Sequence, residues 1–411
     1  MDGRNYAIVT AAYWGFTLTD GALRMLVLLH FHALGYSPLQ LAFLFLLYEF
    51  CGIITNLFGG WIGSRFGLKL TLFAGLATQI IALTMLSLLQ PTWAVALSVA
   101  YVMAAQALSG IAKDLTKMSS KSAVKLLVPR DQGDQSAEGR ALFKWVAVLT
   151  GSKNALKGVG FFLGGILLAT LGFEASLWAM AGGLLLILLA GVIMLEGDLG
   201  KSKQKTKFTQ LFAKSPEINA LSAARFFLFA SRDIWFVVGL PVFLRSVMGW
   251  SFTGVGGFMA AWVIGYGIVQ AAAPSFVHGS ARSAIGWGAL LALVTAAIAA
   301  AVQFDFYPEV TILLGLAIFG VVFAVNSAVH SYLILAYTDE DKVALNVGFY
   351  YMANACGRLV GTLLSGLLYV WAGLPACLWA SAAFVLAAVL LTLRLPRGDD
   401  APHQPIATVA G

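Results

Sequence analysis

The chain is built of long apolar runs separated by short polar turns. A run of roughly twenty apolar residues is long enough to cross a membrane as a helix. Such runs predict helices at residues 6–32, 39–63, 70–90, 93–117, 142–170, 175–195, 217–244, 252–276, 283–303, 310–336, 343–370 and 374–394. The pattern therefore predicts an all-α membrane protein with about twelve transmembrane helices.

A polar segment divides these helices into two sets of six. Residues 197–215 contain no apolar run and carry a cluster of lysines. Similar residues recur at matching places in the two sets: Asp20 and Asp233, then Asn154 before Lys157 and Asn354 before Arg358. We therefore expect two pseudo-symmetric six-helix halves, as in many secondary transporters. The predicted divisions are an N-terminal half (1–196), a basic cytoplasmic linker (197–215), a C-terminal half (216–396) and a cytoplasmic tail (397–411).

Composition and charge support a membrane protein. The chain is 60% hydrophobic and 11% charged, whereas soluble domains carry about 25% charged residues. The net charge of +7 comes mainly from loops on one side, which are expected to be cytoplasmic because Lys and Arg collect there. We therefore predict a bacterial inner-membrane protein with both termini in the cytoplasm and no nucleic-acid partner. Three isolated cysteines, Cys51, Cys356 and Cys377, form no metal motif, so no metal or cofactor is expected.

Charged residues lie in the interiors of only some of the predicted helices. A charge at the membrane centre costs about 2.5–3.5 kcal/mol, so each one needs a partner or water. Helices one, five, seven and eleven hold most of them, with Glu49 on helix two, whereas helices three, six, nine and twelve have no interior charge. This partition predicts a central aqueous cavity lined by the charged helices.

Two interpretations of these charges remain open. In the first they are structural: Asp20 pairs with Arg24, Arg232 pairs with Asp233, and lysines extend to the membrane surface. That extension is expected for Lys113, Lys117, Lys121 and Lys125. In the second, the excess of cations over carboxylates binds an anion with several oxyanion groups, because Arg forms paired hydrogen bonds to such groups and Lys adds a point charge. The candidate substrate-binding residues are Arg24, Lys153, Asn154, Lys157, Arg225, Arg232, Asn326, Asn354 and Arg358. Asp20 and Asp233 either carry a coupling proton or orient neighbouring arginines.

The loop between the second and third predicted helices resembles the signature loop of the major facilitator superfamily. Its matching positions are Gly60, Gly63, Arg65, Gly67 and Lys69. Ser64 stands where the superfamily usually has Asp, which puts any gating ion pair of that Asp in doubt. The resemblance implies a transporter fold of twelve helices.

Three longer strings are similar to the organoarsenical efflux permeases of that superfamily. They are YWGFTLTDGALRML at residues 13–26, AAQALSGIAKDL at 104–115 and KWVAVLTGSKNALKG at 144–158. The resemblance implies export of 1-arseno-3-phosphoglycerate and arsenate resistance, with a glyceraldehyde-3-phosphate dehydrogenase as functional partner. It also implies helix-level similarity to phosphate-ester transporters, whose basic residues on helices one and seven bind the phosphate.

Other functions stay as alternatives. The nearest is a secondary transporter of another organic phosphate or oxyanion. A membrane-embedded enzyme or receptor is not expected, because the chain has no HExxH, GxSxG or Walker A motif. The string Gly151-Ser152-Lys153-Asn154 lacks the order of a phosphate-binding loop and lies inside a predicted membrane helix.

Overall fold

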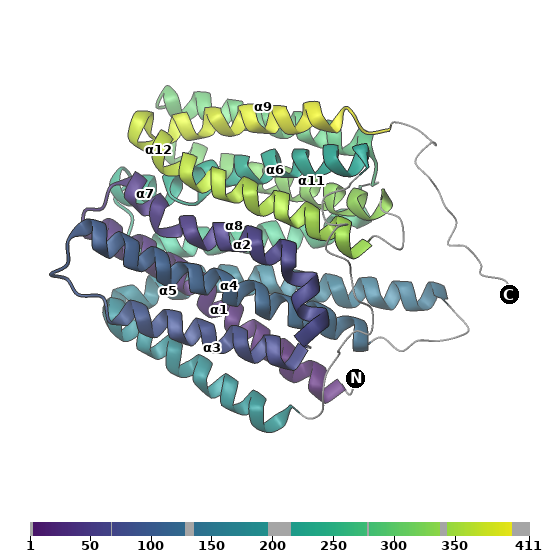
Figure 1. The fold of residues 1–411 in the computed structure, drawn as a ribbon. Helices are drawn as coiled ribbons and strands as arrows, with labels where there is room; N and C mark the ends of the chain where they lie inside the picture. The colour runs from purple at the N-terminus through teal and green to yellow at the C-terminus, as the bar shows by residue number, and fades with distance from the viewer. Residues whose placement is uncertain are drawn as a thin grey trace.

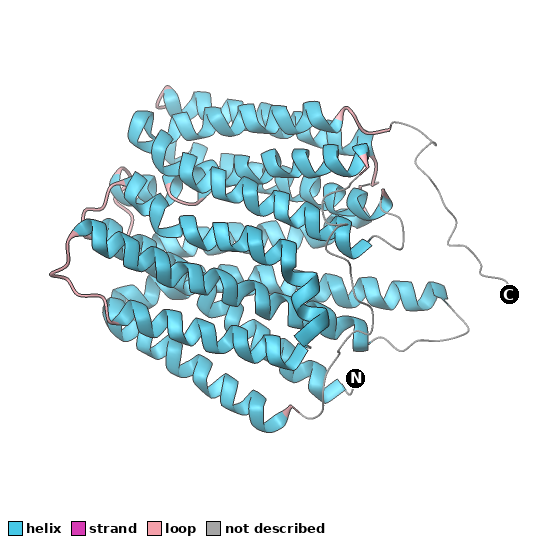
Figure 2. Cartoon of the chain, viewed as in Figure 1, coloured by secondary structure: helices cyan, strands magenta, loops and turns pink. Residues whose placement is uncertain are grey.

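The computed structural model of the protein describes residues 3–66, 68–127, 135–195, 215–277, 279–337 and 343–396. Every regular element within these ranges is a helix (Figure 2). The predicted linker and tail lie almost wholly outside the described residues, so their boundaries remain predictions.

The helices of the N-terminal half follow the predicted apolar runs. They are α1 (Gly3–Ala33), α2 (Pro38–Phe66), α3 (Leu68–Ser87), α4 (Val95–Leu127) and α5 (Gln135–Met194). The C-terminal half contains α6 (Pro216–Phe236), α7 (Gly239–Ser246), α8 (Phe252–Ala272), α9 (Ala281–Gln303), α10 (Pro308–Val310), the π-helical turn η3 (Thr311–Gly315), α11 (Leu316–Ala336) and α12 (Val343–Thr392). The 3-10 turn η2 (Ala273–Ser275) follows α8.

Two very long helices each contain two predicted membrane crossings. In α5 the helix is interrupted at Gly172, whose φ is 75°. In α12 it is interrupted at Ala372 and Gly373, and Gly373 has a φ of 69°. A positive φ is accessible to glycine without the steric cost of a Cβ. Each glycine therefore forms a tight turn between two crossings, as the gaps between the predicted helices indicated.

The seventh crossing differs from the prediction of one continuous helix. It is divided into α6 and α7 at Val237 and Val238. The Ser365 hydroxyl on α12 accepts hydrogen bonds from the backbone N–H groups of Val238 and Gly239, at 3.2 and 3.0 Å. These bonds satisfy backbone donors that the break would otherwise leave unpaired within the membrane.

Twelve crossings can be counted in the described ranges. Nine segments are long and apolar enough to span a membrane, and two of them, of 43 and 45 residues, are the doubled helices α5 and α12. The remaining crossing is α1, with 31 residues, whose hydropathy is lowered by Asp20 and Arg24. The fold is therefore an all-α membrane fold of two six-helix halves.

The two halves lie side by side, with the purple-to-teal helices of the first half below the green-to-yellow helices of the second (Figure 1). Across their boundary, α5 packs on α8 and α2 packs on the first arm of α12. Glycines permit both contacts: a Cβ added to Gly165 would lie 2.7 Å from the Phe252 carbonyl oxygen, and one on Gly366 would lie 2.5 Å from that of Pro38. These approaches bring the first residues of α2 and α8 against α12 and α5 at the boundary.

The described chain begins and ends at the same end of the bundle, where α1 starts and α12 finishes (Figure 1). At the other end, His32 near the end of α1 hydrogen-bonds Ser246 of α7, with Nε2 2.8 Å from Oγ. Gly165 and Gly366 also lie toward this end of their helices. The halves are therefore held together at the end away from the first and last helix termini.

Candidate functional site

A chain of ion pairs crosses the boundary between the halves. Glu49 of α2 accepts hydrogen bonds at one oxygen, Oε1, from Arg24 of α1 at 2.6 Å and from Arg358 of α12 at 2.5 Å. Arg358 also binds Asp233 of α6 at 3.2 Å, and Asp233 pairs with its neighbour Arg232 at 2.5 Å. We call this set Arg24, Glu49, Arg358, Asp233 and Arg232 the central ion-pair chain. Its link between Glu49 and Arg358 joins the two halves directly.

The carboxylates of this chain are more deeply buried than its arginines. The side chains of Glu49 and Asp233 are each 1% exposed, whereas those of the three arginines are 11–16% exposed. Buried carboxylates are tolerated when several hydrogen bonds and opposite charges surround them. The arginines are therefore more accessible than the carboxylates that they bind.

Asp20 lies beside this chain in a separate set of contacts. It accepts a hydrogen bond of 2.7 Å from the Tyr48 hydroxyl on α2. The Tyr48 ring has Lys113 of α4 at 4.0 Å and the Arg24 guanidinium at 5.1 Å from its centre. Tyr48 thus holds one acid by a hydrogen bond and two cations by contact with its aromatic ring.

A second polar cluster surrounds Arg225 of α6, which is buried with 4% exposure. Its Nε donates to Asn354 of α12 at 3.2 Å, and its Nη1 donates to the hydroxyl and carbonyl oxygens of Ser327 on α11 at 3.1 and 3.2 Å. The Phe229 ring covers its guanidinium at 3.9 Å. Within the described residues Arg225 has no carboxylate partner, so its charge is solvated only by neutral groups.

This cluster reaches the N-terminal half through α8. Gln270 donates to the Ser327 hydroxyl at 3.3 Å and accepts from Asn154 of α5 at 3.3 Å. Lys157 lies one helical turn from Asn154, with Nζ 5.8 Å from the centre of the Phe161 ring. Among the described residues Lys157 forms no ion pair, and the charges of Arg24, Arg358 and Asp20 act on it.

Cations outnumber carboxylates in this central region. The cations with described contacts are Arg24, Lys113, Lys117, Lys157, Arg225, Arg232 and Arg358, and the carboxylates are Asp20, Glu49, Asp114 and Asp233. The structure therefore keeps a net positive charge where the two halves meet. Such a region attracts an anion, and Arg and Lys both suit oxyanions.

The comparisons with known proteins identify the fold family. A sequence profile of the Major Facilitator Superfamily matches residues 7–278 and, in a second overlapping match, residues 221–409. The chain belongs to the Major Facilitator Superfamily. Transport across a membrane is therefore its activity, and its helices form a multi-pass membrane protein.

A crystal structure of a mutant form of the nucleoside transporter NupG is similar to the superfamily fold described here. It has a TM-score of 0.70 and 14% sequence identity, and the alignment covers 95% of this chain and 98% of that one. At this identity the similarity concerns the fold alone. No curated protein sequence matches the chain.

Several predicted site residues of this superfamily member meet as expected. Helices one, five, seven and eleven contribute central cations, and Lys113 of α4 adds one that was not expected. The polar residues Tyr350, Asn354 and Arg358 follow one face of α12. Arg225 binds Asn354, and the Tyr350 ring lies 5.0 Å from the Arg225 guanidinium. Lys153 lies on α5 one turn before Lys157, and its side chain also has interaction partners. Asn326 is different: it donates to the Ala284 carbonyl oxygen of α9 at 3.0 Å, inside the C-terminal half.

The predicted pair of Arg232 with Asp233 is present, but one other pairing and the predicted extension of two lysines need correction. Asp20 and Arg24 do not pair with each other, because Asp20 binds Tyr48 and Arg24 binds Glu49. The extension to the membrane surface is wrong for Lys113 and Lys117. Lys113 contacts the Tyr48 ring, whereas Lys117 binds Asp114 at 3.1 Å and Asn56 at 2.6 Å. The side chains of Lys121 and Lys125 lie outside the described residues.

The signature loop of the superfamily is only partly described. The side chains of Gly60, Gly63 and Arg65 lie outside the description, as does Gly67. Lys69 donates to the Leu195 carbonyl oxygen at 2.7 Å, so the start of α3 is tied to the end of the sixth crossing. The gating role of this loop remains a prediction.

Sequence reasoning identified Glu49 as a buried carboxylate without naming its partners, and it gave no role to three other residues at the transporter's centre: Tyr48, Gln270 and Ser327. A charge in the middle of an apolar helix was a signal for Glu49. The other three are ordinary polar residues of membrane helices, and only their positions relative to neighbouring helices reveal their contacts.

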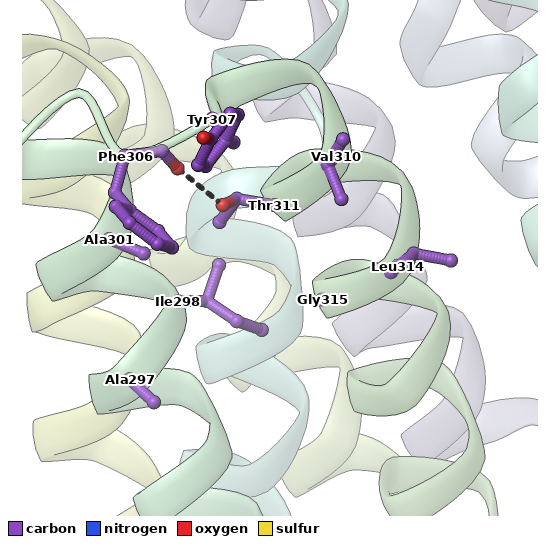
Figure 3. Close-up of a pocket in the computed structure, with 9 residues that line it drawn as sticks. All are labelled: Ala297, Ile298, Ala301, Phe306, Tyr307, Val310, Thr311, Leu314 and Gly315. Carbon is purple, nitrogen blue, oxygen red and sulfur yellow. Dashed lines mark hydrogen bonds between the residues drawn. The ribbon is translucent and has the colours of Figure 1, made fainter.

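A pocket outside this region is apolar. It has a volume of about 330 Å³ and lies between α9 and the segment formed by α10 and η3, lined by Ile298, Phe306, Tyr307 and Leu314 among others (Figure 3). The hydrogen bond from Thr311 to the Phe306 carbonyl oxygen, 2.8 Å long, closes one side. Its lining contains no charged residue, so it has no means of neutralising an anion.

Proposed function

We propose that this transporter exports 1-arseno-3-phosphoglycerate and thereby confers arsenate resistance together with a glyceraldehyde-3-phosphate dehydrogenase. The excess of cations over carboxylates at the boundary between the halves carries the proposal. A ligand with an arsenate and a phosphate supplies anionic oxygens for several such cations. The resemblance of residues 13–26, 104–115 and 144–158 to organoarsenical efflux permeases specifies this ligand among the anions of its class.

The chemistry of the central side chains also favours pentavalent arsenic. An arsenate ester presents oxygen atoms that accept hydrogen bonds from Arg, Lys and Asn, as phosphate does. A trivalent arsenic ligand would need thiols. The described cysteines are free, and Cys377 is buried against the Ser365 carbonyl oxygen, with Sγ 3.6 Å from it. Among the described residues no group of three metal-binding side chains is present, so the cysteines form no cluster for trivalent arsenic.

The proposed mechanism is alternating access, in which the two halves rock about a central site. The ion pair between Glu49 and Arg358 holds the halves together in the described arrangement. The close contacts of α5 with α8 and of α2 with α12 also hold them together. An anion that binds the central cations changes the balance of charge around this ion pair. Binding of the ligand and rearrangement of the halves are coupled in this way.

Transport by everted membrane vesicles tests the substrate. Vesicles containing the protein receive labelled arsenate together with glyceraldehyde 3-phosphate, the dehydrogenase and NAD. We expect label to accumulate inside, because the enzyme forms the arseno-ester that the transporter moves. Omission of the dehydrogenase should abolish accumulation, since arsenate alone has only one oxyanion group.

Accumulation of arsenate without the dehydrogenase would contradict the proposal and favour the alternative, a transporter of another organic phosphate or oxyanion. Vesicles without the protein provide the background.

Variants test whether the central cations take part. Lys157→Ala and Arg358→Ala should each lower uptake at least tenfold, because one removes an unpaired cation and the other breaks the link between the halves. Arg282→Ala serves as a matched control, since Arg282 lies exposed on α9 and should leave uptake unchanged. Normal uptake by both central variants would exclude these cations from the transport site.

A further inference from the structure

Five of the central cations divide into two groups by the partners they have; the other two, Lys113 and Lys117, lie on α4 beside Asp114. Arg24, Arg232 and Arg358 are each bonded to a carboxylate of the central ion-pair chain. Arg225 and Lys157 have no carboxylate partner among the described residues. A buried cation without a countercharge is costly, so the second group has the stronger requirement for an external anion.

The polar partners of Arg225 at Ser327 are all neutral. The hydroxyl oxygen of Ser327 is approached by Arg225 at 3.1 Å, by Gln270 at 3.3 Å and by the Tyr266 hydroxyl at 3.4 Å. The Ser327 hydroxyl can accept from two of these groups and donate its own proton to the Tyr266 oxygen, but it supplies no negative charge to Arg225. A phosphate oxygen group placed there would accept from all of them, and the planar fork of Arg225 suits it.

The two unpaired cations belong to opposite halves but are joined by a short hydrogen-bonded path. From Arg225 on α6 the path runs through Ser327 and Gln270 to Asn154 on α5. Lys157 is the next residue on the same face of α5, because residues three apart are neighbours on a helix surface. An elongated ligand that crosses the boundary would therefore meet one unpaired cation at each end.

We propose that the transporter has two oxyanion subsites: Arg225 with Gln270 and Tyr266 binds a phosphate, and Lys157 with Asn154 binds the second anionic end of the same ligand. Arg24, Arg232 and Arg358 hold the halves together through Glu49 and Asp233 and do not select the ligand. This assignment rests on the proposed export of a two-ended anion and specifies which cation binds each end. On this assignment, Lys157 is the residue that makes an anion with two charged ends bind more tightly than an anion with one.

Two stable probes separate the subsites. 3-Phosphoglycerate has a phosphate and a carboxylate, whereas glycerol 3-phosphate has the phosphate and a neutral hydroxyl in place of the carboxylate. Their affinities are measured by calorimetry on the purified full-length protein in lipid nanodiscs. We expect the unaltered protein to bind 3-phosphoglycerate about tenfold tighter, as one extra charge-assisted contact provides.

Variants of the unpaired cations should change the two affinities differently. Lys157→Gln should weaken 3-phosphoglycerate about tenfold and leave glycerol 3-phosphate nearly unchanged, so the preference disappears. Arg225→Gln should weaken both probes to a similar degree because both carry the phosphate. Arg225→Lys retains the charge without the fork, and we expect it to recover part of the affinity for both. Arg282→Gln is the surface control.

Variants of the ion-paired arginines should change stability rather than the preference between the two probes. Arg24→Gln should lower the thermal unfolding temperature and preserve the ratio between the two affinities. A preference that survives Lys157→Gln, or one that disappears in Arg24→Gln, would overturn the assignment. Failure of the unaltered protein to bind either probe would overturn it as well.

These measurements contain no arsenic and are independent of the vesicle experiment. A preference that depends on Lys157, combined with no dehydrogenase-dependent uptake, would leave the two subsites in place and reject the arseno-ester as the substrate.

Discussion

Glu49 lies where arginines from the two halves meet, and one of its oxygens receives hydrogen bonds from both. Its other oxygen, Oε2, is buried without a hydrogen-bond partner among the described residues. Removing one partner of a buried ion pair leaves the other charge uncompensated, which costs about 3–5 kcal/mol. The loss of Glu49 would leave Arg24 in that condition, whereas Arg358 would keep its bond to Asp233.

We therefore expect Glu49→Gln to destabilise the protein by about 3–5 kcal/mol. Thermal unfolding of the purified protein is compared with that of Arg358→Gln and of the double variant. The double variant should lose less stability than the sum of the single variants, because it removes both charges of one pair. Additive losses would show that Glu49 and Arg358 are energetically independent.

Among the helices, the contact of α2 with α12 depends on glycine at position 366. An added Cβ there would lie 2.6 Å from the Ala42 Cβ as well as close to the Pro38 backbone. Both atoms belong to packed helix segments rather than to flexible side-chain ends. Even a methyl group must therefore separate the two helices slightly, and overpacking of this kind costs about 1–3 kcal/mol.

Gly366→Ala is expected to lower the unfolding temperature and to reduce transport in vesicles. Gly183→Ala is the matched control, because Gly183 lies exposed in α5 and a Cβ there would meet nothing within 4 Å. The control should be neutral or slightly stabilising, since alanine favours helix over glycine by about 1 kcal/mol. Equal behaviour of the two variants would mean that the contact tolerates a methyl group.

The arrangement of the helices explains which features could be predicted from the sequence and which could not. Apolar length located the crossings, and glycines at positions 172 and 373 made the turns that separate those of α5 and α12. The charged helices were also identified, because a charge inside an apolar run is easily seen. Pairing was not predictable: whether Arg24 turns to Asp20 on its own helix or to Glu49 on the next depends on how neighbouring helices are rotated. For the same reason Lys113 was placed at the membrane surface and not beside Tyr48.

Across the whole molecule, the halves are joined at the centre by Glu49 and Arg358 and at one end by His32 and Ser246. Rocking of the halves requires the end contact to open and close. The hydrogen bond between His32 and Ser246 links the ends of α1 and α7, which belong to different halves. A covalent link between these two positions should therefore block the rocking of the halves.

A protein carrying His32→Cys and Ser246→Cys, with Cys51, Cys356 and Cys377 replaced by alanine, should lose transport on oxidation. A reductant should restore it, because the disulfide would hold the two halves together. Each single cysteine variant under the same oxidation is the control. Undiminished transport by the fully cross-linked protein would show that this end does not open.

The surplus of positive charge at the boundary has an electrical consequence. On the proposed function, a ligand whose negative charge offsets that surplus crosses with little net charge, whereas the empty site returns positively charged. A membrane potential negative on the cytoplasmic side acts on each moving charge by about 2.3 kcal/mol per 100 mV. Voltage would then drive the resetting of the empty transporter rather than the crossing of the loaded one. The electrical current of the transport cycle would accordingly arise from the return of the empty transporter.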